Sequence, residues 1–295
     1  MSDFRLKVFQ SVAKNLSFTK ASQELFVSQP AITKHIQELE ATYQTRLFDR
    51  QGSKISLTES GRLLLEHCER ILEEYKRLEY EMHLLHNEYI GELKLGASTT
   101  IAQYVLPPLL GSFIGKFPQV NLSLLNGNSR EIEAALQEHR IDLGLVERVF
   151  RLPNLKYTTF LEDELVAVVH SKSRLQLPEE ITPQDLPAIP LVLRERGSGT
   201  LDVIERSLQK HGVKLSSLHV LMYLGSTESI KLFLENSDCM GIVSIRSICK
   251  ELAAGTFRVV EIKDMPMLRD FCFVQLQGQE GGLSQAFMNY MFMSR

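Results

Sequence analysis

A repeat of apolar residues in the first third of the chain most constrains how this sequence can fold. Over residues 64–85, seven such residues follow one another at alternating spacings of four and three. A heptad repeat of this kind predicts one long α-helix with a narrow apolar stripe. The stripe consists of Leu64, Cys68, Ile71, Tyr75, Leu78, Met82 and Leu85. The helix separates a short segment before it from a much longer one after it.

The rest of this long helix is acidic, since residues 58–90 have a net charge of −4. A helix with so narrow an apolar stripe packs either on its own chain or against a second copy, and the acidic remainder favours the second copy. We therefore expect residues 58–90 to form a dimerisation helix. The expected interface residues are Leu64, Ile71, Tyr75, Leu78, Met82 and Leu85. His83 and His86 lie off the stripe and are expected to be solvated.

The segment before the long helix is basic. Residues 1–57 have a net charge of +3, although the whole chain has −3. Apolar spacing there predicts a first helix, then a short helix with Thr19 as its N-cap that ends at Leu25-Phe26. Another helix follows at once, with Ser28 as N-cap and Pro30 in its first turn. Its predicted core face holds Ile32, Ile36 and Leu39.

The opposite face of that helix holds side chains that are mostly short or able to form hydrogen bonds. They are Pro30, Thr33, Lys34 and Gln37. Two short helices joined by a tight turn are typical of a helix-turn-helix that binds the DNA major groove. Residues 47–50 and 54–57 predict a hairpin around Gln51-Gly52-Ser53, with Arg50 and Lys54 on its arms, which would serve as a wing. The alternative is that the polar face is merely the solvated side of an amphipathic helix.

Several motifs in this region resemble a known family. They are Ser17-Phe18-Thr19-Lys20-Ala21-Ser22, Val27-Ser28-Gln29-Pro30-Ala31-Ile32-Thr33, Ile36-Gln37-Glu38-Leu39-Glu40, Arg46-Leu47-Phe48-Asp49-Arg50 and Leu57-Thr58-Glu59-Ser60-Gly61. Together they resemble the N-terminal domain of LysR-type transcriptional regulators almost position by position. Thr33 and Lys34 stand where the family most often has Ser and Arg.

This resemblance implies a winged helix-turn-helix in residues 1–60 that binds double-stranded operator DNA. It also implies that residues 58–90 are the dimer interface, in a family where homodimers commonly pair into homotetramers. The candidate DNA-binding residues are Gln29, Pro30, Thr33, Lys34, Gln37, Arg50 and Lys54.

From Gly91 onward the chain alternates short apolar runs with amphipathic stretches, which predicts βαβ units and a mostly parallel sheet. The strands predicted in the first half are 92–96, 120–125 and 143–146, with helices over 100–116 and 129–138. A second sheet is predicted from strands 165–169, 191–193, 220–224 and 241–244, with helices over 200–210, 229–235 and 245–254. A strand over 269–275 and a helix from Ser284 are expected to return to the first half and pack with it.

The resemblance implies an α/β effector-binding domain over residues 91–295, akin to two-lobed periplasmic binding proteins. Lobe I is then about 91–161 plus 267–295, and lobe II about 162–266. The expected fold class is α/β with an N-terminal all-α winged helix-turn-helix domain.

Hydroxyl and amide side chains gather where predicted strands end and helices begin, which is where open α/β sheets bind ligands. Such residues are also the ordinary N-caps of helices, so each one alone is weak evidence for a ligand site. In the family, hydroxyls after the first strand and in the Gly-Ser-Gly-Thr loop line an effector cleft. The candidates are Ser98, Thr99, Thr100, Asn128, Ser198, Thr200 and Thr227. Nearby Arg194 or Arg196 favours a small, anionic effector.

The local sequences at two of these strand ends resemble those of some members of the family. Gly96-Ala97-Ser98-Thr99-Thr100-Ile101 and Gly127-Asn128 resemble members that regulate sulfur or carbon assimilation.

Composition argues against several other classes of protein. The longest uncharged stretch, residues 95–115, contains Pro107-Pro108 and is a poor membrane-spanning helix. The N-terminus lacks the pattern of a secretory signal, so we expect a cytoplasmic protein without membrane association. The four cysteines lack metal-ligand spacing and are expected to be free thiols. No metal or cofactor is expected.

Two other functions stay open. An enzyme on the α/β lobes is disfavoured because the chain lacks a Gly-x-Ser-x-Gly elbow, a phosphate loop and a complete dinucleotide fingerprint. A redox-sensing regulator would need two cysteines that can meet, and Cys239 with Cys249 is the closest pair in sequence. Packed, unreactive thiols are the favoured interpretation of that pair.

Overall fold

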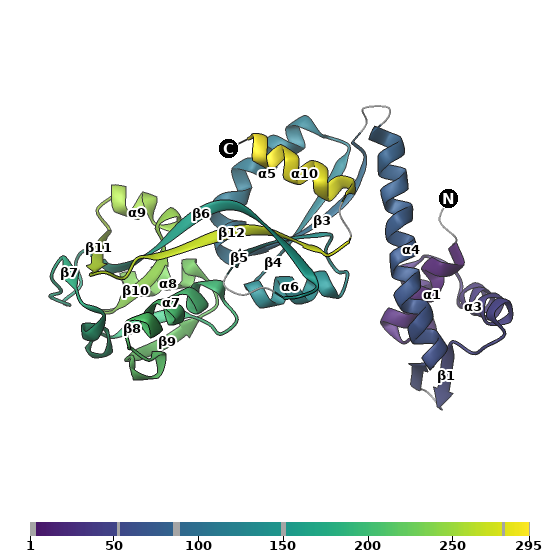
Figure 1. Cartoon of the computed structure of the whole chain (residues 1–295), viewed down its shortest axis with the longest axis horizontal. Helices are drawn as coiled ribbons and strands as arrows, with labels where there is room; N and C mark the ends of the chain where they lie inside the picture. Colours follow the sequence, from purple (N-terminus) through teal and green to yellow (C-terminus); the bar gives the residue numbers. More distant parts are fainter. Residues whose placement is uncertain (1–3, 52–53, 85–88, 149–151, 279–280, 295) are drawn as a thin grey trace. The chain divides into compact units, whose positions relative to one another are not determined.

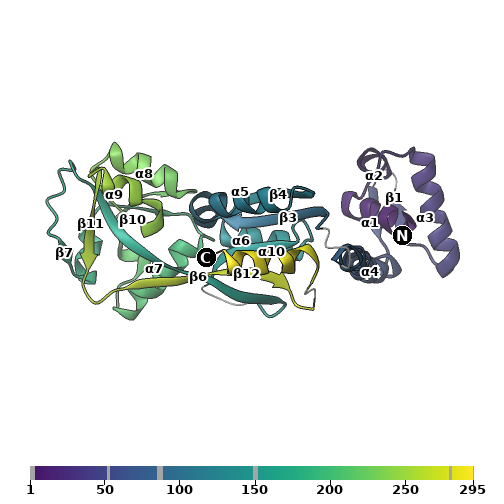
Figure 2. The ribbon, with the colours of Figure 1, turned by 90° about the horizontal axis from the view of Figure 1, so that it is seen from above.

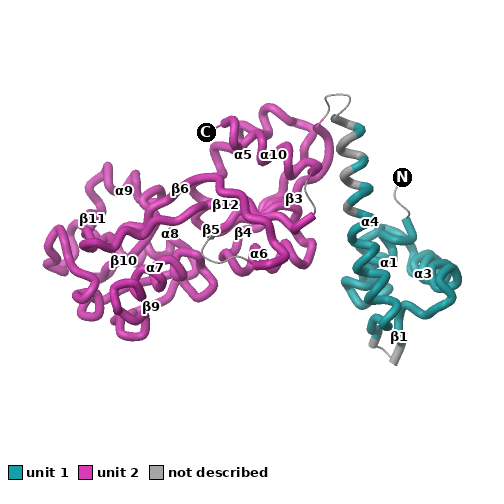
Figure 3. The backbone as a smooth tube through the Cα atoms, viewed as in Figure 1, with its two compact units in different colours: residues 1–88 teal, residues 89–295 magenta. Residues whose placement is uncertain are grey.

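The computed structural model describes residues 4–51, 54–84, 89–148, 152–278 and 281–294. It does not describe the side chains of Arg50, Gln51 and Lys54, nor those of several residues in the second half of the long helix. Contacts between Cα atoms divide the chain into unit 1, residues 1–88, and unit 2, residues 89–295 (Figure 3). Among the described residues, no helix has the length and the apolar character needed to span a membrane.

Unit 1 is helical apart from one hairpin. Its elements are α1 (Phe4–Asn15), α2 (Phe18–Glu24), α3 (Gln29–Tyr43), β1 (Phe48–Gln51), β2 (Lys54–Leu57) and α4 (Glu59–Leu84). Ile32, Ile36 and Leu39 of α3 are 0–3% exposed and join a core shared with α1, α2 and α4. The predicted helix pair, antiparallel hairpin and long helix are therefore confirmed, while residues 52–53 of the hairpin turn lie outside the described residues.

The first short helix of the pair begins earlier than the sequence predicted. Ser17, not Thr19, is the N-cap of α2, because the Ser17 hydroxyl accepts a hydrogen bond from the third backbone N–H of the helix at 3.2 Å. The prediction was wrong because it overlooked Phe18. This residue is the first of the helix, and its ring is buried in the core. Ser28 is confirmed as the N-cap of α3, with Pro30 in the first turn.

The apolar stripe of α4 has two different environments. Near the start of the helix, Cys68 is fully buried in the core of unit 1 and Leu64 packs against the same core. Farther along, Ile71, Leu78 and Met82 are 42–53% exposed. The first part of the stripe thus packs on its own chain, which was one of the two alternatives considered for this helix. Only the later part is exposed for a partner, and Leu85 lies outside the described residues.

Unit 2 alternates strands and helices, which confirms the predicted α/β class. Its elements are β3 (Gly91–Ser98), the π-helical η1 (Ile101–Val105), α5 (Leu106–Lys116), β4 (Val120–Gly127), α6 (Ser129–Gln137), β5 (Leu143–Arg148), β6 (Leu155–His170), β7 (Glu180–Ile181), η2 (Pro183–Ala188), β8 (Leu191–Arg194), α7 (Gly199–Lys210), η3 (Leu215–Ser217), β9 (Val220–Leu224), α8 (Thr227–Glu235), β10 (Met240–Ser244), η4 (Ile245–Ser247), α9 (Cys249–Ala253), β11 (Phe257–Ile262), β12 (Met267–Leu276) and α10 (Gly282–Met293). The segments η2, η3 and η4 are short 3₁₀ turns.

The strands of unit 2 form one hydrogen-bonded sheet, not the two separate sheets that the sequence predicted. Its order is β4-β3-β5-β12-β6-β10-β8-β9; β11 also pairs with β6, and β7 pairs with β11. The two long strands β6 and β12 pair antiparallel and run through both lobes (Figure 1). The sequence predicted only residues 165–169 of β6, because the acidic run 162–164 interrupts its apolar pattern. The strands β7 and β11 were also missed.

Helices cover both faces of the sheet in each lobe. In lobe I, α5 and α10 lie on one face and α6 on the other (Figures 1 and 2). In lobe II, the core under α7 is separated by the sheet from the core under α8. The predicted single helix over 245–254 is wrong: the 3₁₀ turn η4 precedes the five-residue helix α9. Each lobe is therefore a three-layer α/β/α arrangement.

Candidate functional site

The polar face of α3 is accessible in unit 1. Gln29, Pro30, Lys34 and Gln37 are exposed, and Thr33 is half-buried. The Thr33 hydroxyl donates to the Gln29 backbone carbonyl at 3.1 Å. These side chains include amide, hydroxyl and ammonium groups, which are the kinds of group that form hydrogen bonds with base edges. The side chains of Arg50 and Lys54, the candidate wing cations, lie outside the described residues.

In unit 2, three strands bring polar residues to one end of the sheet. The parallel strands β3 and β5 are paired with Ala97 opposite Leu145, so their carboxyl ends lie side by side. Ser98 ends β3, and Glu147 is the second-last residue of β5. The antiparallel strand β12 begins at the same end, with Arg269 two residues before the partner of Glu147. This is the end at which open α/β sheets bind ligands.

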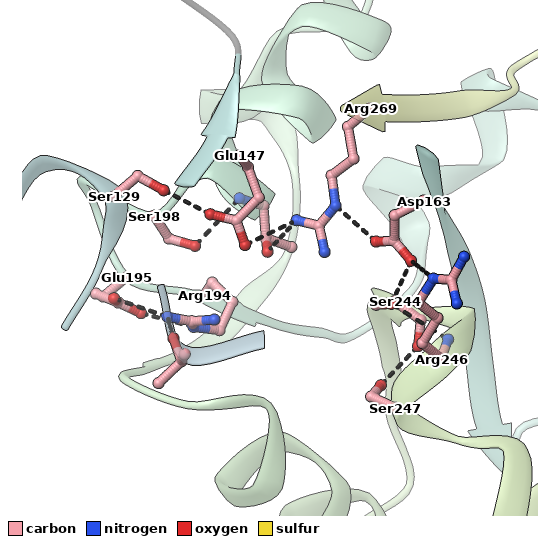
Figure 4. A network of polar contacts seen from close by, with 12 residues as sticks. Ser129, Glu147, Asp163, Arg194, Glu195, Ser198, Ser244, Arg246, Ser247 and Arg269 are labelled. Atoms are coloured by element: carbon pink, nitrogen blue, oxygen red, sulfur yellow. Dashed lines mark hydrogen bonds and ion pairs between the residues drawn. The ribbon is translucent and has the colours of Figure 1, made fainter. Parts of the chain in front are cut away.

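Arg269 is at the centre of a buried polar network (Figure 4). Its Nε donates to Asp163 Oδ2 at 2.7 Å, and its Nη1 donates to the Thr200 hydroxyl at 2.8 Å. Nη1 also lies 3.4 Å from Glu147 Oε1. All three charged residues are at most 5% exposed. Among the described residues, Arg269 Nη2 has no hydrogen-bond partner.

The two carboxylates beside Arg269 are themselves held by hydroxyl groups. Ser129 Oγ donates to Glu147 Oε2 at 2.5 Å, and Ser244 Oγ donates to Asp163 Oδ1 at 2.7 Å. Buried charges are tolerated when they are paired and hydrogen-bonded in this way. The network therefore fixes the guanidinium of Arg269 in one orientation.

Two hydroxyls of the candidate site are buried without a partner. Neither Ser98 Oγ nor Thr100 Oγ1 has a hydrogen-bond partner in the described part of the chain. Thr100 is the N-cap of η1, yet its side chain forms no capping hydrogen bond. An unpaired buried hydroxyl costs about 1–3 kcal/mol, so it is expected where a ligand supplies the missing partner. Thr99, between them, accepts from Arg194 Nη2 at 2.7 Å.

Two other candidate residues, Asn128 and Ser198, have structural roles. The Asn128 side chain caps α6 as part of a capping box, and the Ser198 hydroxyl accepts from the Thr200 backbone N–H at 3.2 Å. Thr227 is buried in the first turn of α8, whose N-cap is Ser226. The N-cap interpretation therefore describes what Asn128 and Ser198 do in this structure.

The sequence pointed to Arg194 or Arg196 as a source of positive charge, and Arg269 was missed; Arg196 is exposed. Arg194 is buried, but its Nε and Nη2 donate to the Glu195 carboxylate at 2.8 and 3.0 Å, so its charge is balanced within the chain. The signal that would have found Arg269 is a charged pair, Arg269-Asp270, inside a strand that is otherwise mostly apolar. Its partner Asp163 is 106 residues away in sequence, so the pairing itself had no local signature.

The cysteine pair of the redox alternative lies in two different environments. Cys239 is buried, and burial raises the pKa of its thiol. Cys249 is exposed on α9, and its thiol donates to the Ile245 carbonyl at 3.3 Å. Redox-sensing thiols are activated by a lowered pKa, so the environment of Cys239 does not favour that role. Within the described ranges, no group of three or more His, Cys, Asp or Glu side chains is placed to hold a metal ion.

Both parts of the chain match known protein families. Residues 4–62 match the bacterial regulatory helix-turn-helix proteins of the lysR family, and residues 86–292 match the LysR substrate binding domain. The HTH-type transcriptional regulator CysL of Bacillus subtilis is 29% identical over 91% of this chain and 89% of its own length. The RuBisCO operon transcriptional regulator of Acidithiobacillus ferrooxidans is 30% identical over 98% of this chain and 92% of its own.

A solved structure shares the fold of unit 2. The regulatory domain of Synechocystis CcmR, in complex with 2-PG, has a TM-score of 0.62 and 28% sequence identity. The match covers 69% of this chain and 97% of that one. With the helix-turn-helix, the two-lobed α/β unit and both family matches agreeing, this chain belongs to the LysR family of transcriptional regulators, which bind DNA and small-molecule effectors.

Proposed function

We propose that the effector of this regulator is a small anion held by Arg269, Ser98 and Thr100 where the two lobes meet. The observation that supports this proposal most is that all three side chains have a buried donor atom without a partner at one end of the sheet. An oxyanion has the acceptors that these donors lack, and an arginine N–H bound to a negative oxygen is among the stronger hydrogen bonds of proteins.

The similar domain of CcmR supports the anionic class. Its complex is with 2-PG, 2-phosphoglycolate, whose phosphate and carboxylate are both anionic. The resemblance of residues 96–101 to regulators of carbon or sulfur assimilation leads to the same class of compact, oxygen-rich anions. 2-Phosphoglycolate, phosphate and sulfate are therefore the first ligands to test.

The test is calorimetric titration of the full chain with these three anions and with an uncharged diol of similar size. We expect at least one anion to bind. Ser98→Ala should weaken that binding by about 1–2 kcal/mol, because one hydrogen bond is lost. Ser217→Ala is the matched control, since the Ser217 hydroxyl donates to the Lys214 carbonyl in lobe II, away from this end of the sheet. Equal affinity for Ser98→Ala and wild type would contradict the proposed site.

For the DNA-binding unit, we propose that Gln29, Thr33 and Lys34 read bases from α3. Pro30 and Gln37 flank them on the same face, and Arg50 and Lys54 would contact phosphates from the wing. Phosphate contacts of this kind make the affinity for DNA fall steeply with salt.

We propose that the exposed part of the α4 stripe forms the dimer interface. A second copy that covers Ile71, Leu78 and Met82 removes apolar surface that is otherwise in water. Dimerisation also places two recognition helices on successive faces of the major groove, which is how helix-turn-helix dimers bind paired half-sites.

This function involves no catalysis by the chain itself, which agrees with relatives that are transcriptional regulators. A regulator acts where its operator is, so we propose that the protein works in the cytoplasm.

A further inference from the structure

A polar contact outside the candidate effector site also joins the two lobes. Tyr104, on η1 of lobe I, donates its hydroxyl proton to the Glu228 carboxylate, on α8 of lobe II. Since the two residues belong to different lobes, the bond exists only while the lobes are together. Burial and this hydrogen bond both raise the pKa of Tyr104, so its hydroxyl stays protonated and able to donate at neutral pH.

The acceptor of this bond is fixed by a buried lysine. Lys231 Nζ lies 2.9 Å from Glu228 Oε1 and 2.6 Å from Glu251 Oε1. The Lys231 side chain is only 8% exposed, and its ammonium lies 5.4 Å from the centre of the Tyr104 ring. Lobe I thus supplies both a donor for Glu228 and an aromatic face for the buried ammonium, which adds a cation–π contact.

Other polar contacts also cross between the lobes. Some involve the candidate effector site, and Arg130 of α6 contributes two more outside it: its backbone N–H donates to the Gly197 carbonyl at 3.3 Å, and its Nη2 lies 3.8 Å from Asp202 Oδ1. Arg194 bonds Thr99 next to Ser98 and Thr100, and Arg269 bonds Thr200. Tyr104 and Glu228 contact none of these residues in the described hydrogen-bond network. Their bond can therefore hold the lobes together whether or not a ligand is bound.

We propose that Tyr104, Glu228 and Lys231 form a latch that holds the lobes in their closed arrangement and opens to admit the effector. The donor atoms of Ser98, Thr100 and Arg269 are buried in the arrangement described, so a ligand reaches them only after the lobes part. Parting breaks the bond between Tyr104 and Glu228. The latch therefore shifts the equilibrium between the two arrangements toward the closed one. A ligand changes the same equilibrium if its affinities for the closed and open arrangements differ.

Hydrogen exchange of backbone amides in the full chain tests the latch without any ligand. Tyr104→Phe removes the hydroxyl and keeps the ring. We expect exchange to become about tenfold faster in η1 and also in α8, which belongs to the other lobe, because a hydrogen bond to a charged group is lost from the closed arrangement.

Tyr157→Phe is the matched control. The Tyr157 hydroxyl donates to Glu133 Oε1 at 2.7 Å, and both residues are in lobe I. This variant should speed exchange around α6 and β6 and leave α8 as in wild type. Acceleration confined to η1 in Tyr104→Phe, or equal acceleration of α8 in both variants, would overturn the latch.

Glu228→Gln probes the same bond from lobe II. It replaces the charged acceptor by a neutral amide oxygen, which weakens the bond without removing it. It should speed exchange in η1 several-fold, and it should add nothing in η1 when Tyr104→Phe is already present, since both changes act on one bond. Full additivity in η1 would also overturn the proposal. No ligand enters these measurements, so their outcome is independent of the proposed function, on which only the role in admitting the effector rests.

Discussion

Two threonines in unit 2 provide a pair of identical substitutions with opposite expected effects on stability. Thr100 Oγ1 is buried without a partner, whereas Thr200 Oγ1 accepts a hydrogen bond from Arg269. Both residues are 1% exposed. Valine keeps the branched shape of threonine and replaces the hydroxyl by a methyl group. Each substitution therefore measures how much the hydroxyl group contributes to stability.

The expected magnitudes follow from the bonding of each oxygen. Thr100→Val removes an unpaired buried hydroxyl and should stabilise the protein by about 1 kcal/mol. Thr200→Val leaves Arg269 Nη1 without this acceptor and should destabilise it by about 1–3 kcal/mol. For a unit of this size, 1 kcal/mol corresponds to a shift of about 2–4 °C in melting temperature.

The assay is differential scanning calorimetry of the full chain without ligand, followed by calorimetric titration with whichever anion binds wild type. Thr100→Val should raise the melting temperature of unit 2 and weaken anion binding by about 5- to 30-fold, which corresponds to about 1–2 kcal/mol. If Thr100→Val destabilises the protein as much as Thr200→Val does, its hydroxyl has a partner in the folded chain and the site is misassigned.

Three further predictions concern unit 1. Gln29→Ala should cost about 1–3 kcal/mol at one operator position and leave non-specific binding intact, as a panel of single-base operator variants would show; equal weakening on every sequence would contradict base reading. Leu78→Asp, at a side chain 52% exposed, should dissociate dimers in light scattering and weaken operator binding, whereas an intact dimer would place the interface elsewhere. Burial raises the pKa of the Cys68 thiol to about 12, so this thiol should resist a thiol reagent at pH 8 while exposed Cys249 reacts at once. Because the raised pKa belongs to the folded state, the associated stability is present below the ordinary pKa of about 9 and is lost as the pH rises toward 12.

Much of the fold was predictable because local pattern and burial agree. The apolar spacing of α3 and the alternation of strands and helices in unit 2 both depend on residues close together in sequence. Strand β6 was mostly missed because its middle is acidic, and Asp163 there is tolerated through partners that are distant in sequence, Arg269 and Ser244. Short-range pattern carries no information on such partners.

The position of the candidate effector site could be predicted from the sequence, but not which of its hydroxyl groups are free to bind a ligand. Ser98 and Thr100 follow from the rule that ligands bind where parallel strands end. The same rule selected Asn128 and Ser198, which the structure uses as helix caps, because a capping side chain and a ligand-binding side chain have the same sequence signature. Only the three-dimensional arrangement shows which hydroxyls are paired.

Whether a small anion controls DNA binding is decided by comparing one anion's affinity for the free regulator with its affinity for the regulator bound to an operator selected from random DNA. Linkage requires that the anion and the operator change each other's affinity by the same factor. We predict a factor of at least five in wild type, with a markedly weaker affinity of Thr100→Val for the anion in both states. Equal anion affinity for free and DNA-bound wild type would show that the anion is not an effector and that the proposed site does not control DNA binding.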